Sequence, residues 1–395
     1  MRVSLLTNVL SPYRIPVFRE LAATPGLELR ILLSSRTELH WRKAFARAYE
    51  AGREQLDLEV VPGFSFERRV PMQREAGVSQ RVATHLPYGA LAALRRQRPD
   101  VVVSSELGAR SAIAALYCAL FRVPLVIWSY QSRSAADAAP AWLEALRRGL
   151  LSRAQAVVGM GVQAREVLRG RGVPDARLFD APNAHDAARY EAALAGVQPM
   201  AARVALRAPL RAREHVALVA GRLVESKGIE PLLEVWPEIP TYLRDRWTLL
   251  FVGDGPLAAR VRVEAERRPG EIAHVESVLP ERMPELYAAV DRLLFPSLAD
   301  PWGLVVNEAL ACSVPVACSR LAGCAEDLIE PGRNGWLFDP TDAREMRDVL
   351  TQVLETGDEE TLRAQARDTA KRFGPEVMAA GMRRAIQYAA STRRT

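Results

Sequence analysis

The chain has 395 residues, 49% of them hydrophobic and 25% charged, which is typical of a globular protein with two domains. No uncharged apolar run approaches the ~20 residues of a bilayer-spanning helix, and the four cysteines lack the spacing of a metal site or a disulfide framework. The net charge of +6 comes without a nucleic-acid-binding motif, so we expect no nucleic-acid partner.

The first half of the chain alternates short apolar, β-branched runs with longer amphipathic stretches. Its opening run ends at the polar Thr7 and Asn8, which indicates a first strand rather than a signal peptide and favours a cytoplasmic protein. Strands are predicted at residues 3–7, 27–33, 56–61, 101–104, 125–128 and 156–158, and helices at 16–23, 86–97 and 109–121. This alternation predicts βαβ units and a parallel sheet covered on both faces.

The alternation weakens between residues 183 and 213, which are rich in Ala, Arg and Pro, and then restarts. Strands are predicted at 216–220, 248–252, 273–276, 292–296, 314–318 and 336–338, and a final helix at 375–390. The pattern predicts two α/β domains, residues 1–190 and 191–374, and a C-terminal helical segment, residues 375–395. Because ligands bind beyond the carboxyl ends of parallel strands, the loops after these strands are the places to look for a functional site.

Charge is divided unequally between the two predicted domains. Residues 1–190 hold 27 Lys/Arg and 17 Asp/Glu, a net of +10, whereas residues 191–395 hold 26 and 30, a net of −4. The basic half is consistent with peripheral contact to an anionic membrane, and equally with scattered arginines that meet only solvent. Only Lys43, Lys227 and Lys371 among the 53 basic residues are lysines, so a lysine hints at a position that needs an ammonium group.

Two loops carry the charges and glycines of a phosphate site. After the strand at 216–220, Arg222 and Lys227 lie five residues apart in a loop that starts at Gly221. A guanidinium fork and an ammonium group at a strand end can clamp a diphosphate, and a plain surface loop is the alternative. The loop after 248–252 reads G-D-G-P from Gly253, which permits close approach of backbone or ligand but is not a dinucleotide fingerprint.

The stretch from residue 296 to 310 combines a strand end, a loop with Asp300 and a helix predicted to begin near Gly303. The free amides and the dipole at such a helix start favour an anion. Glu308 lies on this helix, about 7 Å beyond its start at 1.5 Å per residue. A carboxylate in an otherwise apolar helix needs partners, for which sugar hydroxyls are suitable. A solvated helix face and a simple turn are the alternatives for Glu308 and Asp300.

These motifs together resemble the C-terminal domain of family-4 retaining glycosyltransferases. The spacing from Asp300 to Glu308 matches the E-x7-E motif of that family, with aspartate in place of the first glutamate. The resemblance is strong over about residues 178–340, and in the first half it rests on the α/β pattern and on S-P-Y-R at 11–14. It implies the GT-B fold, in which two Rossmann-like domains face each other across a cleft and a C-terminal helix crosses back to the first domain.

The resemblance also implies an activity. It implies a glycosyltransferase that moves a sugar from a nucleotide diphosphate sugar to an acceptor, with retention at the anomeric carbon and without a metal ion or other cofactor. The basic first domain would bind the acceptor, which favours a glycan or lipid-linked intermediate of cell-surface polysaccharide assembly. A GT-B nucleotide-sugar epimerase and a non-catalytic nucleotide-sugar-binding relative are the alternatives.

The resemblance implies roles residue by residue. Arg222 and Lys227 would hold the donor diphosphate, Glu308 the ribose, and Asp300 the hydroxyls of the transferred sugar. Val278 would lie at the nucleotide base and contact it through its backbone. The further donor contacts would come from Gly221, Gly253, Gly303, Leu304 and Val305.

Several features depart from the family pattern. The glycine-rich first loop is replaced by S-P-Y-R, so Tyr13 and Arg14 become acceptor-side candidates. The acceptor-side histidine found after the fifth strand in many relatives is missing, and His85 and His185, the nearest in sequence, are interpreted as structural. Glu106, just past a strand, is the remaining candidate to face the acceptor as a base. Residues 182–186, P-N-A-H-D, resemble the interdomain P-N-G-V-D segment of the family.

Overall fold

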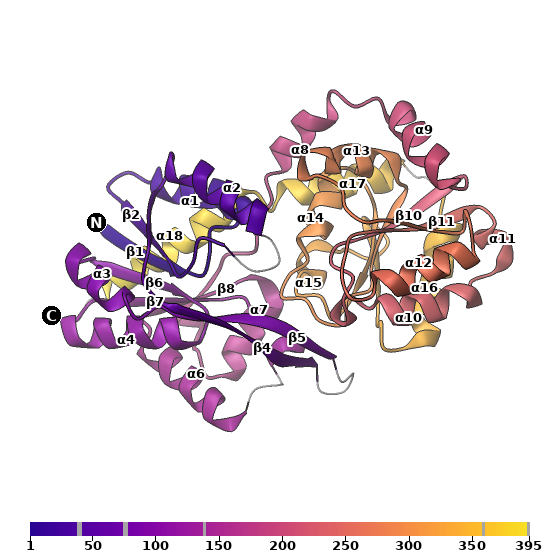
Figure 1. Ribbon diagram of the computed structural model, residues 1–395. Coiled ribbons are helices and arrows are strands. Elements are labelled where there is room, and N and C mark those ends of the chain that lie inside the picture. The colour runs from indigo at the N-terminus through magenta and orange to yellow at the C-terminus, as the bar shows by residue number, and fades with distance from the viewer. Residues whose placement is uncertain (38–41, 74–77, 137–139, 358–359, 393–395) are drawn as a thin grey trace.

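The computed structural model describes residues 1–37, 42–73, 78–136, 140–357 and 360–392, which form two α/β domains lying side by side (Figure 1). The first domain contains a parallel sheet in the order β3-β2-β1-β6-β7-β8-β9. Its strands are β1 (Arg2–Thr7), β2 (Glu28–Leu33), β3 (Asp57–Val60), β6 (Val101–Ser105), β7 (Leu125–Ser129), β8 (Ala156–Gly159) and β9 (Leu178–Asp180). Its helices are α1 (Ile15–Ala22), α2 (Arg42–Arg53), α3 (Ala90–Gln97), α4 (Ala109–Phe121), α5 (Arg133–Ala136), α6 (Ala141–Arg153) and α7 (Gly161–Gly170).

The second domain contains a parallel sheet in the order β12-β11-β10-β13-β14-β15. Its strands are β10 (His215–Ala220), β11 (Trp247–Val252), β12 (Ile272–Val275), β13 (Arg292–Phe295), β14 (Val316–Ser319) and β15 (Gly335–Phe338). Its helices are α8 (Ala187–Leu194), α9 (Pro199–Leu210), α10 (Ile229–Val235), α11 (Thr241–Arg244), α12 (Ala258–Arg267), α13 (Met283–Ala289), α14 (Leu304–Ala311), α15 (Ala325–Leu328), α16 (Ala343–Glu355) and α17 (Glu360–Lys371).

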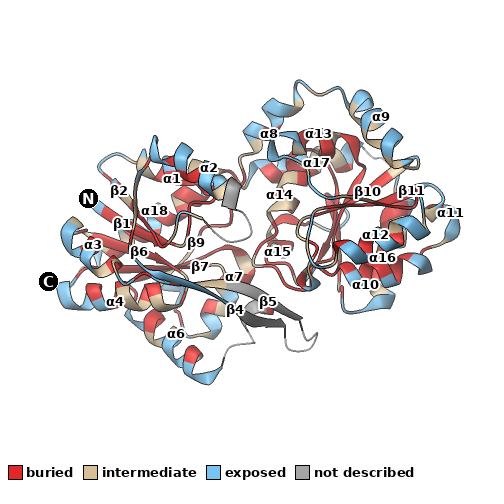
Figure 2. Cartoon of the chain, in the orientation of Figure 1, coloured by how far each residue is buried: buried red, intermediate tan, exposed pale blue. Residues whose placement is uncertain are grey.

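Both sheets are buried on both faces, which explains why their strands are continuous apolar runs rather than alternating ones. All residues of β6 and β11 are buried. Figure 2 shows the sheets in red between helices whose outer faces are exposed. Helix ends follow from local chemistry as well: α16 begins after Asp342, whose carboxylate accepts hydrogen bonds from the amides of Arg344 and Glu345.

The strands predicted from the apolar runs are confirmed to within two residues at each end. One prediction was wrong: the helix expected from residue 86 begins only at Ala90. The residues before it form an antiparallel hairpin of β4 (Phe64–Gln73) and β5 (Val78–Leu86), which belongs to neither parallel sheet. Phe64 and Phe66 at its start are exposed, so this segment lacks the continuous apolar run by which the buried strands were recognised.

The last helix, α18 (Pro375–Ser391), returns from the second domain and packs on the first (Figure 1). Met378, Met382 and Ile386 are fully buried in the same hydrophobic cluster as β1 and α1. Each such side chain contributes about 1.5–3 kcal/mol by leaving water. Gly381 permits this packing, because a Cβ there would lie 2.1 Å from the carbonyl oxygen of Asp180. Among the described residues, no helix has the length and apolarity to cross a membrane.

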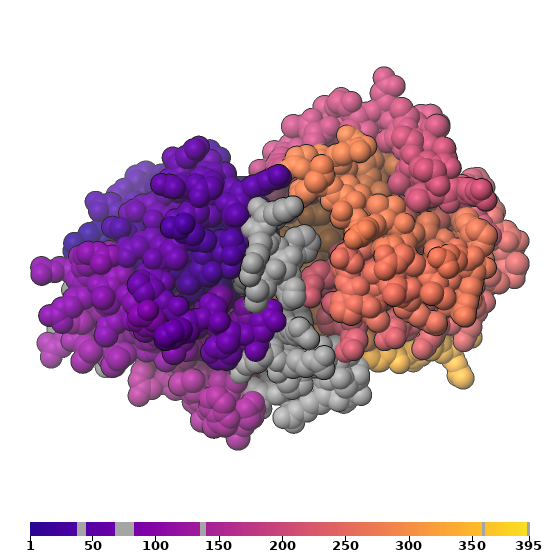
Figure 3. Space-filling model, viewed as in Figure 1, coloured from indigo at the N-terminus to yellow at the C-terminus, as the bar shows by residue number. Residues whose placement is uncertain are grey.

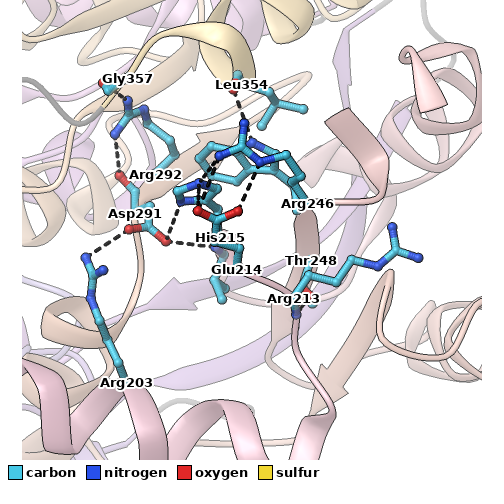
Figure 4. A network of polar contacts seen from close by, with 12 residues as sticks. Arg203, Arg213, Glu214, His215, Arg246, Thr248, Asp291, Arg292, Leu354 and Gly357 are labelled. Carbon is cyan, nitrogen blue, oxygen red and sulfur yellow. Dashed lines mark hydrogen bonds and ion pairs between the residues drawn. The ribbon is translucent and has the colours of Figure 1, made fainter. Parts of the chain in front are cut away.

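A buried carboxylate fixes the segment that enters the second domain (Figure 4). The side chain of Asp291 is 4% exposed, accepts a 2.9 Å hydrogen bond from Arg203 on α9, and accepts another of 2.9 Å from the amide of Val216 on β10. Arg207 lies 3.6 Å and Arg363 3.8 Å from the same carboxylate. These contacts hold α9, β10 and α17 around the start of β13.

Candidate functional site

The carboxyl ends of β10, β11 and β12 surround a cavity of about 750 Å³, together with α14 and the loop before α13. We call it the donor cavity. It brings together six of the residues predicted to bind a donor: Gly221, Arg222, Gly253, Val278, Val305 and Glu308. Lys227, Asp300, Gly303 and Leu304 do not line this cavity.

Backbone packing shapes the floor of the donor cavity. Gly253 has φ +149°, and a Cβ there would lie 1.8 Å from the carbonyl oxygen of Gly221. Only glycine fits this approach of the two loops, which keeps the space above them open for a ligand. The second glycine of this loop has the same role, since a Cβ at Gly255 would lie 2.4 Å from the carbonyl oxygen of Leu223.

Arg222 reaches the cavity as a half-buried guanidinium. Burial lowers the pKa of Arg222, and the nearby carboxylate of Glu67 on β4 opposes this effect. A cation that has lost part of its hydration gains from an anionic ligand.

Lys227 contacts Asp300, a residue that belongs to a different sequence motif. Its ammonium group forms an ion pair with the carboxylate of Asp300 and lies 5.3 Å from the ring centre of Phe295. The other carboxylate oxygen of Asp300 accepts a 3.0 Å hydrogen bond from the amide of Trp302. The residue predicted to hold diphosphate and the residue predicted to hold sugar are thus direct partners.

Helix α14 begins at Leu304, directly after Gly303 as predicted, and Gly303 is its N-cap residue with φ +105°. A Cβ at Gly303 would lie 2.6 Å from the ring of Phe295, so the sharp entry into the helix requires glycine. The cap residue has no side chain that hydrogen-bonds the first amides. Gly303 and Leu304 line a second cavity, of about 290 Å³, between the domains.

Glu308 is held by two tyrosines that sequence reasoning missed. The hydroxyl of Tyr287 on α13 donates a 2.9 Å hydrogen bond to its carboxylate. Burial raises the pKa of Glu308 to about 7, although hydrogen bonds from Tyr287 and Tyr190 oppose that rise. The titration of Glu308 is therefore shifted towards neutral pH. The tyrosines come from α13 and α8, and no motif spacing links them to Glu308.

The second cavity is lined by residues of both domains. Figure 3 shows the first domain, indigo to magenta, beside the orange part of the second domain. Tyr13 and Arg14 line the cavity on one side, and Asp300 lines it on the other. The side chain of Arg14 is buried, with its guanidinium 4.4 Å from the ring centre of Trp128 and 5.4 Å from that of Tyr130.

Arg14 stays charged in this buried position. Burial lowers its pKa, but Tyr13, Tyr130 and the carboxylate of Glu106 outweigh this effect and raise the pKa above the usual value. Arg14 donates a 3.3 Å hydrogen bond to the hydroxyl of Thr7, and its Nε has no hydrogen-bond partner among the described residues. A cation is therefore fixed at the wall between the domains.

A third cavity, of about 120 Å³, lies in the first domain, and Asn8 and Tyr130 border both it and the second cavity. Glu106 lines it from a left-handed backbone conformation, φ +70°, which is uncommon for a residue other than glycine. Burial and the neighbouring Glu106 raise the pKa of Tyr130. Arg14, Tyr130 and Glu106 therefore form a continuous polar wall from the second cavity into the third.

The two histidines lie in different places. His85 lines the third cavity, its Nδ1 is 2.6 Å from the hydroxyl of Ser65, and burial lowers its pKa. His185 lines none of the three cavities, and its ring packs 4.3 Å from that of Tyr190. Burial lowers the pKa of His185 to about 4, which fits the structural interpretation. Arg110 and Arg147 also line the third cavity and were missed, because no strand-end motif marks them.

The arrangement of two parallel-sheet domains, a cleft between them and a helix that crosses back defines a GT-B fold. Solved structures agree. The chain matches Anabaena Alr3699/HepE in complex with UDP with a TM-score of 0.73 and 19% identity, over 98% of this chain and 100% of that one. It matches the apo form of the lipopolysaccharide outer core galactosyltransferase WaaB with a TM-score of 0.70 and 15% identity, over 98% and 99%.

The resemblance read from the sequence motifs is confirmed: residues 206–373 match the family of glycosyl transferases group 1. The O-antigen chain mannosyltransferase B of Escherichia coli is 32% identical over 142 residues, 35% of this chain and 36% of that protein. The D-inositol 3-phosphate glycosyltransferase of Corynebacterium diphtheriae is 33% identical over 150 residues, 36% and 35%. The matching part spans about a third of the length of each of these two curated relatives.

Proposed function

We propose that this protein is a glycosyltransferase that transfers a sugar from a nucleotide diphosphate sugar to an acceptor hydroxyl. The observation that carries the proposal is the donor cavity, which is lined by both Arg222 and Glu308, two residues of the segment that matches glycosyl transferases group 1. The fold relative from Anabaena is described in complex with UDP and with UDP-glucose, which supports a nucleotide-sugar donor here.

In the proposed complex, the donor diphosphate lies between Arg222, Lys227 and the start of α14. Negative charge grows on the leaving diphosphate as the glycosidic bond breaks, and prearranged positive groups stabilise it. Lys227 would turn from Asp300 towards the phosphates, which frees the Asp300 carboxylate for hydroxyls of the transferred sugar. Binding of the donor would itself drive this exchange, because its diphosphate competes with the Asp300 carboxylate for the ammonium group of Lys227.

The proposal includes retention at the anomeric carbon and no metal ion. Within the described parts of the chain, no group of three or more His, Cys, Asp or Glu residues is placed to hold a metal. Arg222, Lys227 and the α14 dipole provide the positive charge instead. In a front-face route, the leaving phosphate takes the proton of the acceptor hydroxyl, which approaches along the wall of Arg14, Tyr130 and Glu106. Closure of the domains would exclude water and suppress donor hydrolysis.

We also propose a glycan or lipid-linked acceptor and a cytoplasmic protein in peripheral contact with the inner face of a membrane. The net charge of +10 over residues 1–190 supports such a contact. Binding to anionic liposomes should fall as salt screens the charges. Absence of binding at low salt would remove this part of the proposal.

The donor is tested first by thermal stabilisation with UDP-, GDP-, ADP- and TDP-sugars. A ligand at 100 times its dissociation constant adds about 2.7 kcal/mol of stability. We expect this gain for one nucleotide class, and its loss in Arg222→Ala and Lys227→Ala. Arg262→Ala is the matched control, since Arg262 is exposed on α12 and lies outside the donor cavity.

Turnover separates glycosyl transfer from its alternatives. Sugar transferred to an acceptor supports the proposal. An epimerised nucleotide sugar formed without acceptor would indicate an epimerase. Binding without turnover on any acceptor would indicate a non-catalytic protein, and no stabilisation by any nucleotide sugar would contradict the donor site itself.

A further inference from the structure

The donor cavity has two ends, which the sheet order defines. Along the carboxyl edge of the second sheet the strands follow the order β13, β10, β11, β12. Arg222 follows β10 and α14 follows β13, so the proposed function places the diphosphate at this end. The nucleotide base then lies at the other end of the cavity, over β11 and β12. The inference below rests on that placement.

The far end of the cavity contains one carboxylate that is ready to receive hydrogen bonds. Glu276 follows β12, lines the cavity and is exposed, and no hydrogen bond or ion pair joins its side chain to any described residue. The neighbouring lining groups there carry no charge: Ser277 is polar, and Val278, Pro280 and Met283 are apolar.

The other carboxylates of the cavity are placed or occupied differently. Asp254 accepts a 2.7 Å hydrogen bond from the amide of Gly255, and Glu308 is held by Tyr287. Glu225 lies two residues from Lys227, at the diphosphate end. Among the described residues that line the cavity, Glu276 is thus the acidic residue at the base end, and its carboxylate has no hydrogen bond or ion pair.

A carboxylate distinguishes the nucleotide bases by their hydrogen-bonding edges. Guanine presents two adjacent donors, N1–H and the N2 amino group, which match the two oxygens of a carboxylate. Uracil presents one N–H between two carbonyl oxygens, which a carboxylate repels. Adenine presents its N6 amino group beside the acceptor N1, so one carboxylate oxygen would face a lone pair. An unmatched polar edge of this kind lowers affinity strongly.

We propose that the donor is a guanosine diphosphate sugar and that Glu276 reads the N1–H and N2 amino edge of its guanine. Glu276 is then a specificity-determining residue of the proposed transferase. The Val278 backbone would complete recognition of the base from the neighbouring loop position. The diphosphate contacts of Arg222 and Lys227 would be common to all nucleotides and give no base selectivity.

The test is the dissociation constant of GDP, IDP, UDP and ADP for the full chain, measured by calorimetry. Inosine keeps N1–H but lacks the N2 amino group, so it isolates one of the two proposed hydrogen bonds. We expect GDP to bind roughly 10- to 100-fold more tightly than UDP or ADP, with IDP in between. Glu276→Gln should weaken the binding of GDP roughly 10-fold or more. It should also bring the ratio of the GDP and IDP affinities towards one, because the glutamine amide has a single oxygen and cannot accept hydrogen bonds from both guanine donors.

The matched control is Glu281→Gln, an exposed glutamate of the 3₁₀ turn Pro280–Arg282 that does not line the cavity. It should bind all four nucleotides as the wild type does. Unliganded thermal midpoints of both variants check that folding is intact.

Three results would overturn the inference, and they are distinguishable. Tighter binding of UDP or ADP than of GDP would reject guanine while the proposed glycosyltransferase stands. A GDP preference unchanged in Glu276→Gln would reject Glu276 as its reader. Binding of none of the four nucleotides would reject this inference together with the proposed donor site.

Discussion

The two halves of the cleft are built in different ways. On the second-domain side, the charges and glycines lie in short segments that follow β10, β11 and β13. The spacing of these residues along the chain can therefore be recognised as a sequence motif. On the first-domain side, Arg14 packs on Trp128 and Tyr130, and Glu106 follows another strand. Three separate segments meet there, and no spacing relates them. A site made by loops after successive strands leaves a pattern in the sequence, whereas a site made by distant side chains leaves isolated residues.

We expect some buried charges of the second domain to stabilise the fold and to have no part in the donor site. Asp291→Ala would remove the carboxylate that Arg203, Arg207 and Arg363 share, and should lower the free energy of unfolding by about 3–5 kcal/mol. Urea titration measures this loss. Asp348→Ala, at an exposed ion pair, should change stability by less than about 1 kcal/mol. Equal losses in the two variants would contradict the buried-network interpretation.

Variants of Arg14 test whether the two halves of the cleft act independently. Arg14→Ala removes the cation from the wall of the second cavity, and we expect a loss in transfer rate on the order of 100-fold with little change in nucleotide affinity. Steady-state kinetics and nucleotide titration on the same preparation give both numbers. Arg14→Lys keeps the charge but not the planar stacking on Trp128, so a partial rescue would separate charge from packing. If nucleotide affinity fell as it does in Arg222→Ala, Arg14 would belong to the donor half.

The smallest effect concerns pH and Glu308. Because burial raises the pKa of Glu308 to about 7, the carboxylate is mostly protonated at pH 6 and mostly ionised at pH 8. An ionised carboxylate is the better acceptor for two ribose hydroxyls, so nucleotide affinity should rise with pH through 7, by up to about 10-fold. Calorimetry at several pH values measures the rise.

The control for this pH dependence is Glu308→Gln, which has no proton to lose and also corrects for titration of the phosphates. Tyr287→Phe removes a hydrogen bond that lowers the pKa of Glu308, so the midpoint should move to higher pH. An unchanged midpoint in Tyr287→Phe would argue against the tyrosine contact as a cause of the pH dependence.

Much of the fold was predictable because buried parallel strands are continuous apolar runs. The strands of both sheets, apart from the short β9, follow from that pattern. The hairpin of β4 and β5 does not, since its register is set by pairing between the two strands and not by a continuous apolar run. The unpredicted β9 is three residues long and half-buried, so it carries too few apolar positions to stand out.

The sequence by itself determined the two domains, the returning helix and the donor-side residues, because each depends on local patterning or on spacing within one loop. The roles of those donor-side residues stay predictions until a ligand is bound. Only the tertiary structure decided that Lys227 pairs with Asp300, that Tyr287 holds Glu308, and that Arg14 reaches Trp128. These contacts join elements far apart in the chain, and the ionic states of Arg14 and Glu308 depend on burial and neighbours that exist only once the chain is folded.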